Sequence, residues 1–519
     1  MALIFESFLY DFVAFLVFCA VILHLYIRHI YSYWEKRNVK YVKPTFPFGN
    51  FKDAMLLKKT FPDVYSEMYN STDDKILGVY TTTVPELLVR DPELIRLILI
   101  KDFQCFHDRG VYCHETMDPL SAHLFSLNGE KWRNLRANVT PAFSSGKLKG
   151  MFFTILNCGK SIEGFLTKRL NEEIDVRDLT ASYTINVIAS VAFGLDMDTI
   201  LDPSCEFRDL GRRFFEPTVK TAIRQASTLL VPHVGRMFRV KSVDNNYEEF
   251  IYRILKETMT FREKNNVQRK DFLQLLLQLK NTGKVDSEDN WNIQSTGSDN
   301  NSKTLTFHEL AAQIHLFFQA GYETTSATIS FCLYQLAKQP SIQAKVQEEI
   351  DEVIKKHNGE ITYEAVMEMK YMESCIDETL RLHSSLAVLS RECTREYELP
   401  GTGLTLEKGT RILIPVHAIQ CDSKYYSDPE EFKPERFLQE HPNSGSKGII
   451  YMPFGEGPRI CIGLRMGKME AKIALLLILS KFNVHLGEHL RNMKKLRYEK
   501  KSFLPQIEGG TFLKFSHRK

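Results

Sequence analysis

The segment that most constrains this chain is a turn-rich stretch at 451–463, with the sequence Y-M-P-F-G-E-G-P-R-I-C-I-G. It matches the pattern F-x-x-G-x-R-x-C-x-G at every fixed position, a coincidence expected in roughly one chain in ten thousand. The glycines and the proline before Cys461 break regular structure, and residues 464–482 are good helix formers. The sequence therefore predicts that Cys461 lies in a loop at the N-terminus of a helix.

A cysteine at such a position favours a charged sulfur, because free backbone N–H groups and the helix dipole stabilise a thiolate. A thiolate is a metal ligand or a nucleophile. No second cysteine stands within two to four residues, so a structural zinc site is disfavoured. One thiolate with Phe454 and Arg459 nearby suits a planar anionic cofactor such as haem, with a propionate near Arg459. The alternative is that Cys461 is an ordinary buried cysteine.

The motif is similar to the haem-binding signature of the cytochrome P-450 superfamily of haem-thiolate monooxygenases, and the resemblance covers nearly the whole chain. It implies a mainly α fold with a smaller β part, in one catalytic domain over residues 51–519. It also implies that haem b (iron protoporphyrin IX) is the cofactor, that Cys461 is its axial thiolate ligand, and that Phe454 packs beside the sulfur. The sequence of residues 106–127 is similar to that of insect microsomal members of the family.

A long helical pattern at 305–338 has F-F-Q-A-G-Y-E-T-T at its centre. Gly321 costs about 1 kcal/mol against alanine inside a helix, so the pattern predicts a helix that is widened at a functional site. The stretch resembles the family's A/G-G-x-D/E-T motif. By that resemblance, Thr324 supplies a proton to bound oxygen and Glu323 resupplies it through water. The alternative for the threonines is packing, with hydrogen bonds to carbonyls four residues earlier.

Three further positions are expected to hold the haem propionates. Trp132 and Arg136 are four residues apart and share a face of a predicted helix. Alone, this pair indicates a surface cation stacked on an aromatic ring, but in the family these positions contact a propionate. The resemblance assigns the same role to Arg391.

A second set of charged residues is expected to be structural. Glu378, Arg381 and Arg436 resemble the family's buried ion-pair network. Two nearby features depart from the family pattern: Ser384-Ser385 stands where a Pro-Pro pair is usual, and I-Q-C-D at 419–422 stands where many relatives have a histidine and an arginine.

The residue patterns of three further segments predict their local structure. Residues 76–90 predict a β-hairpin, and the polar stretch 286–303 predicts a disordered surface loop. The apolar stretch 227–234 predicts an exposed contact surface, at the lip of a substrate channel that dips into the membrane; the alternative is a mobile loop without a partner. Loops on a rigid scaffold often determine specificity. The candidates for lining the substrate pocket are Phe106, Leu120, Phe125, Phe317, Ala320, Val388 and Leu389; the alternative for the loop residues among them is that they anchor the loop to the core.

The N-terminus predicts a membrane anchor. Residues 8–27 are apolar over about the length of a bilayer span, residues 28–50 form a basic linker rich in Pro and Gly, and the catalytic domain follows. Lysine and arginine are concentrated after the span, which places the N-terminus in the lumen of the endoplasmic reticulum and the catalytic domain in the cytosol. The ten scattered cysteines fit that reducing compartment.

Composition limits the partners. The net charge is only +3, so nothing indicates nucleic acid. No complete G-x-G-x-x-G loop is present, so electrons must come from outside. The resemblance implies an NADPH-dependent diflavin reductase, with cytochrome b5 as an additional candidate. Lys433, Arg465 and Lys468 are candidate docking cations.

The sequence therefore predicts a membrane-anchored monooxygenase that inserts one oxygen atom from O2 into lipophilic small molecules such as xenobiotics. One alternative is a haem-thiolate isomerase or dehydratase that needs no reductase, which the Glu323-Thr324 pair disfavours. Another is a haem sensor or carrier without catalysis.

Overall fold

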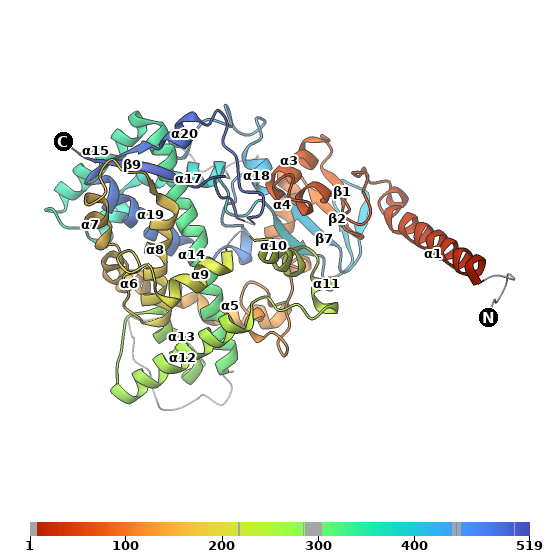
Figure 1. Ribbon diagram of the computed structural model, residues 1–519, viewed down its shortest axis with the longest axis horizontal. Helices are drawn as coiled ribbons and strands as arrows, with labels where there is room; N and C mark the ends of the chain where they lie inside the picture. Colours follow the sequence, from red (N-terminus) through yellow and green to blue (C-terminus); the bar gives the residue numbers. More distant parts are fainter. Residues whose placement is uncertain are drawn as a thin grey trace.

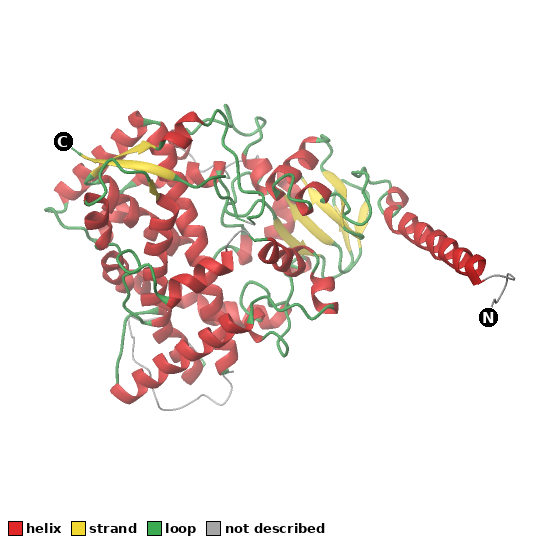
Figure 2. Ribbon diagram, viewed as in Figure 1, coloured by secondary structure: helices red, strands yellow, loops and turns green. Residues whose placement is uncertain are grey.

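The computed structural model describes residues 8–215, 218–283, 285, 304–438, 443, 448–502 and 504–518. It confirms the expected class, because helices dominate and the strands of the described residues form three small sheets (Figure 2). The predicted loop at 286–303 lies outside the described residues. Helix α1 (Phe8–Tyr31) projects from the body of the protein on the right of Figure 1.

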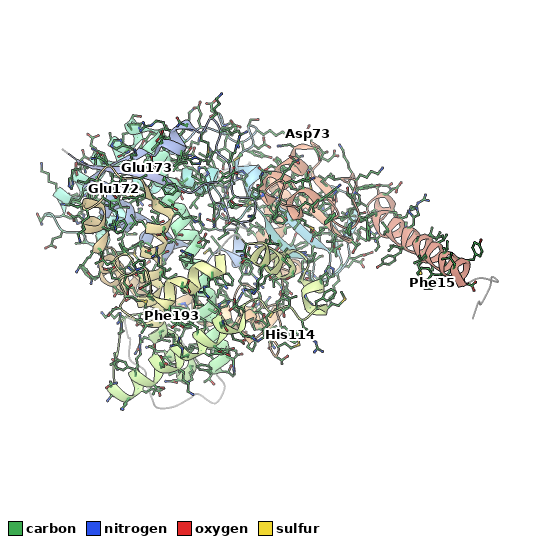
Figure 3. The ribbon with its side chains drawn as sticks, in the orientation of Figure 1. Phe15, Asp73, His114, Glu172, Glu173 and Phe193 are labelled. Carbon is green, nitrogen blue, oxygen red and sulfur yellow. The ribbon has the colours of Figure 1, made fainter. Side chains whose placement is uncertain are left out.

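Helix α1 contains the predicted apolar span. Its large side chains are exposed, and Phe15 points away from the helix into open space (Figure 3). Its length and composition are sufficient for a membrane span. The chain after α1 is not a free linker throughout, because Trp34 is fully buried and its Nε1 donates to the carbonyl of Val79 at 3.2 Å. Part of the 28–50 segment is thereby fixed to the β sheet.

The largest sheet lies next to α1. Strands β1 (Ile76–Thr81) and β2 (Val84–Val89) form the hairpin predicted at 76–90. Strand β2 pairs in parallel with β7 (Arg411–Ile414), which pairs antiparallel with β4 (Leu389–Glu392). The other sheets consist of β3 (Ile174–Asp175), β9 (Phe512–His517) and β8 (Phe482–Leu486), and of β5 (Tyr397–Leu399) and β6 (Leu404–Leu406).

One long helix organises the helical part. Helix α14 (Phe307–Lys338) passes through its centre (Figure 1) and contacts α8 (Val176–Ile188), α17 (Lys370–Leu382) and α19 (Leu464–Leu479). A capping box stabilises its start: Thr306 Oγ1 accepts from the N–H of Glu309, whose carboxylate accepts from the N–H of Thr306.

The predicted widening of this helix at Gly321 is wrong, because α14 is a regular α-helix over its whole length. The glycine serves packing instead. A Cβ at residue 321 would lie 2.8 Å from Cδ1 of Ile188 on α8. The absence of a side chain therefore allows α8 and α14 to pack closely.

The remaining α-helices surround this centre and the sheets. They are α2 (Lys52–Met55), α3 (Phe61–Asn70), α4 (Pro92–Arg96), α5 (Gly129–Val139), α6 (Ser145–Cys158), α7 (Ser161–Thr167), α9 (Glu206–Phe215), α10 (Val219–Gln225), α11 (Pro232–Met237), α12 (Asn245–Asn265), α13 (Phe272–Thr282), α15 (Pro340–Lys356), α16 (Tyr363–Glu368), α18 (Val416–Gln420) and α20 (Glu488–Asn492).

The apolar stretch 227–234 is not the exposed surface that we predicted. Ser227, Val231 and Pro232 are buried, because a π-helical turn (Ala226–Leu230) folds this segment inward. The exposed large apolar side chains of this region lie on either side of it, at Val219, Ile223, Met237 and Phe238.

The predicted charge network is present in the core. Glu378 accepts from Nε of Arg381 at 2.7 Å and from its second guanidinium nitrogen at 2.9 Å. Arg436 Nε donates to the same carboxylate at 3.3 Å. The side chains of Glu378 and Arg381 are fully buried, so the network fixes the C-terminal end of α17 to the segment before the cysteine loop.

Candidate functional site

The loop that carries Cys461 is held by backbone contacts. The N–H of Cys461 donates to the carbonyl of Phe454 at 2.9 Å, which closes the turn. Gly457 has a φ of 72°, and a Cβ there would lie 1.9 Å from the carbonyl oxygen of Leu99. Only glycine fits this position. Helix α19 begins three residues after Cys461, with Gly463 as its N-cap, as the sequence predicted.

Two opposing effects act on the Cys461 thiol. Burial raises its pKa, whereas the N–H of Gly463 and the charges of Arg109 and Arg136 lower it. The net shift is upward, so the protein alone favours the thiol. A bound metal cation would reverse this, because coordination removes the proton from a thiol.

Cys461 faces a cavity of about 330 Å³ that extends from α19 across α14 to the β1-β2-β7-β4 sheet. The wall is mostly apolar, as expected for a small-molecule site. It includes five of the residues predicted to line the pocket, namely Phe125, Phe317, Ala320, Val388 and Leu389.

Phe106 and Leu120 are not among the cavity-lining residues. Both are fully buried elsewhere: the Phe106 ring packs against Tyr397 at 4.9 Å, and Leu120 belongs to the main helical core. The loop at 106–127 therefore uses them as anchors and presents Phe125 to the cavity.

Arginine side chains gather at one end of this cavity. Arg391 is buried, its Nε has no hydrogen-bond partner among the described residues, and burial lowers its pKa to about 10. Burial also lowers the pKa of Arg109, and Arg459, Arg391 and Arg136 lower it further by repulsion. Such a cluster of buried cations calls for anions. Two carboxylates at the edge of a porphyrin, with iron at Cys461, would meet that requirement, so the residues present fit a haem.

Arg459 lines the cavity, and it also holds the loop at 106–127. Its guanidinium donates to the carbonyls of His107, Leu124, Phe125 and Leu127 and lies over the Trp132 ring at 4.0 Å. These bonds fix the 106–127 loop over the cavity. Trp132 and Arg136 are not among the cavity-lining residues, so Trp132 acts on the site through Arg459.

Arg109 is a residue that the sequence analysis missed. It lines the cavity, donates to the carbonyl of Phe125 at 2.9 Å, and stacks on the Phe125 ring at 4.2 Å. A single arginine in an irregular loop carries no periodic signal. The neighbouring Gly110, with a φ of 65°, was the one local indication of a constrained turn.

The two predicted catalytic residues point in different directions. Thr324 lines the cavity, and its hydroxyl donates to the carbonyl of Ala320 at 2.6 Å. Glu323 is only 2% exposed and is not among the cavity-lining residues. Its carboxylate forms an ion pair with Arg177 of α8 and accepts from Gln506 Nε2 at 3.2 Å.

A thiol at a helix start, a buried arginine cluster and an apolar cavity crossed by one long helix are the features expected of a haem-thiolate protein. The sequence profile described as Cytochrome P450 matches residues 41–512. Probable cytochrome P450 6d5 of Drosophila melanogaster is 40% identical over 91% of this chain and 93% of that relative. Cytochrome P450 6d1 of Musca domestica is 39% identical over 89% of this chain and 92% of that relative. Cytochrome P450 6k1 of Blattella germanica is 36% identical over 89% and 88%, respectively.

The chain therefore belongs to the cytochrome P450 family of haem-thiolate monooxygenases. The relatives named here are all insect proteins, in line with the resemblance drawn from the 106–127 segment.

Proposed function

We propose that this protein is a membrane-anchored monooxygenase that oxidises lipophilic small molecules such as xenobiotics, with electrons supplied from NADPH by a partner reductase. One observation carries the proposal: a single, mostly apolar cavity is bounded by Cys461 on one side and by Thr324 of α14 on another. A lipophilic molecule held there would lie beside Thr324 and next to the haem that Cys461 would bind.

The binding of the cofactor is assigned to five residues. Cys461 would bind the iron, and the guanidinium groups of Arg109, Arg391 and Arg459, which line the cavity, would balance the propionates. Arg136, outside the lining, would add its charge to theirs. The bound haem supplies the activation of O2, from which one oxygen atom enters the substrate and the other leaves as water. The apolar wall excludes bulk water from this chemistry.

Proton delivery is assigned to α14. The Thr324 hydroxyl, which donates to the Ala320 carbonyl, would rotate to donate into the cavity. Glu323 precedes it, about 100° away around the helix axis, where Arg177 and Gln506 hold its carboxylate. From there it would resupply the proton to Thr324 through water.

The membrane and the electron donor complete the proposal. Residues 8–27 would span the endoplasmic reticulum membrane, with the N-terminus in the lumen and residues 51–519 in the cytosol. Of the three docking cations, Lys468 is bound to Glu373 and Asp377, and Lys433 to Asp428 and Glu431. Arg465 is exposed and donates to Ser145 Oγ at 3.2 Å. We therefore assign the larger docking role to Arg465, toward a diflavin reductase and, as a second donor, cytochrome b5.

Reconstitution tests the proposal. Reduced holoprotein exposed to carbon monoxide should give the spectrum of a thiolate-ligated haem, and oxidation of lipophilic probes should require NADPH and reductase together. A histidine-type spectrum would overturn the haem-thiolate assignment. Turnover that continues without reductase would instead support an isomerase or a dehydratase. Protease added to intact microsomes should digest the catalytic domain if it faces the cytosol.

A further inference from the structure

Tyr65 of α3 is an unusual residue of the cavity wall. It is only 3% exposed, it packs edge-on against Phe51 at 5.2 Å, and it lines the same cavity as Cys461. Its hydroxyl forms no hydrogen bond with any residue that the structure describes. A buried tyrosine hydroxyl normally has a partner, because leaving it without one costs about 1–3 kcal/mol. Tyr69, one turn later in the same helix, shows the usual arrangement and donates to Asp422 at 2.6 Å.

Tyr65 and Cys461 belong to different parts of the cavity wall. Helix α3 is beside strands β1 and β2 on the right of Figure 1, whereas α19 is on the left, beyond α14. The wall near Tyr65 is formed by Leu413 of β7 and by Val388, which pack in one cluster with it. A molecule that reaches from Cys461 to Tyr65 therefore passes mostly along apolar side chains.

The charges at this end are already matched. Arg411 of β7 also lines the cavity, and its guanidinium pairs with Glu86 at 2.6 Å. Glu86 accepts from the Thr81 hydroxyl as well, and Glu392 lies opposite Arg411 in the β4-β7 register. An additional carboxylate at this end would lie close to Glu86 and Glu392. The charge of Arg411 is already balanced by Glu86 and would not compensate for the repulsion. A neutral oxygen would meet no such repulsion and could accept from the Tyr65 hydroxyl.

We propose that Tyr65 is a specificity-determining residue, whose hydroxyl donates a hydrogen bond to a neutral acceptor oxygen at one end of an elongated lipophilic substrate. The inference rests on the monooxygenase function proposed above and narrows its substrate class to lipophiles with an ester, ketone or ether group. Such anchoring holds the opposite, apolar end of the molecule next to the haem that Cys461 would bind. Oxygen insertion is then directed to carbons remote from the acceptor.

Binding to purified holoprotein without reductase tests this directly, because no turnover occurs. Three probes with chains of equal length differ only at one end: n-undecane, methyl nonanoate and decanoic acid. Dissociation constants are measured from the haem spin-state shift for the wild type, Tyr65→Phe and the matched control Tyr69→Phe. The control removes a hydroxyl from the same helix, but one that is bonded to Asp422.

We expect Tyr65→Phe to weaken methyl nonanoate binding about three- to tenfold, the loss of one hydrogen bond, and to leave n-undecane binding unchanged. Tyr69→Phe should change neither. In the wild type, methyl nonanoate should bind more tightly than decanoic acid at neutral pH. Equal effects of Tyr65→Phe on methyl nonanoate and n-undecane would overturn the anchoring role, and tightest binding of the acid would overturn the choice of a neutral acceptor. If either of these results is found with a protein whose carbon monoxide spectrum is of the thiolate type, the Tyr65 inference fails but the haem-thiolate monooxygenase proposal does not. The two failures can therefore be distinguished.

Discussion

Gln420 donates a hydrogen bond from Nε2 to Oγ of Ser384 at 2.7 Å, and both side chains are buried. The same amide group donates to the carbonyls of Leu380 and Arg381, and its oxygen accepts from the N–H of Met452 at 2.9 Å. Ser384 and Gln420 belong to the two segments, 384–385 and 419–422, that the sequence analysis singled out as departures from the family pattern. The departures contact each other and tie the end of α17 to the start of the cysteine loop.

We expect these two residues to be energetically coupled. Ser384→Ala should lower the free energy of unfolding by about 1 kcal/mol, and Gln420→Ala by about 2–3 kcal/mol, because it also leaves the Met452 N–H without a partner. The double variant should cost about 1 kcal/mol less than the sum. Urea unfolding of the four proteins measures the cycle, and strict additivity would contradict the coupling.

Cys461→Ser should remove thiolate ligation, since a serine hydroxyl is not deprotonated under the same conditions. The reduced protein with carbon monoxide should lose the thiolate-type spectrum, and oxidation of lipophilic probes should stop. Cys205→Ser, at a partly exposed cysteine before α9, serves as the control and should keep both. Retention of the spectrum in Cys461→Ser would show that another residue binds the iron.

Thr324→Ala should separate electron consumption from product formation. A positioned proton donor contributes about 100-fold or more to a proton transfer, so we expect product formed per NADPH to fall steeply and peroxide to rise. Thr324→Ser retains the hydroxyl and should remain close to the wild type. Parallel assays of NADPH, peroxide and product measure the ratio; unchanged coupling in Thr324→Ala would assign the threonine to packing.

Glu378→Gln should destabilise the protein severely, because it leaves Arg381 as a buried charge without its carboxylate. The expected loss in the free energy of unfolding is about 3–5 kcal/mol. The matched control is Glu435→Gln, which removes a partly exposed carboxylate paired with Lys345 at 2.8 Å and should cost less than about 1 kcal/mol. Denaturant unfolding measures the free energy of unfolding of both variants. Similar losses in the two variants would contradict the role assigned to burial.

Stability should depend on pH through Glu373, which contacts Lys472 at 2.9 Å and Lys468 at 3.3 Å. Burial raises the pKa of this carboxyl, but the charges of Lys472, Lys468 and Lys370 outweigh burial and hold the pKa at about 2, below its ordinary 4.5. Because the pKa is lower in the folded state, its stabilisation is complete above about pH 4.5 and is lost as the pH falls toward 2.

Glu373→Gln should therefore lower the unfolding free energy at about pH 6 and have little effect at about pH 2. Urea unfolding across this interval provides the test. Glu430→Gln, at an exposed carboxyl, controls for the general effect of acid. A Glu373→Gln variant with the wild-type pH profile would exclude this carboxyl as the source.

A feature could be predicted from the sequence when the residues that form it lie close together in the chain. The hydrogen bond that closes the cysteine loop, from Cys461 to Phe454, and the cap of α14 join residues close in sequence, so the pattern contains them. Gly321 was identified as exceptional but was assigned a wrong cause, because its reason is Ile188 on another helix. The cavity end at Tyr65 and Arg411 combines α3 with β7, and no spacing rule connects segments so far apart. Phe106 and Leu120 were misplaced for a related reason: composition marks a loop side chain as apolar but does not fix the side to which it turns.

Gly457, in the loop that carries Cys461, lies against the carbonyl oxygen of Leu99. Segments from the N-terminal and the C-terminal part of the chain are therefore both needed to complete one pocket. During synthesis on a ribosome, α1 emerges first and can enter the membrane at once. The sulfur emerges late, after helices α1 to α18 and before α19 and α20. Capture of the porphyrin is therefore a late step in biogenesis, and a nascent chain that stalls before residue 461 would be inserted but colourless.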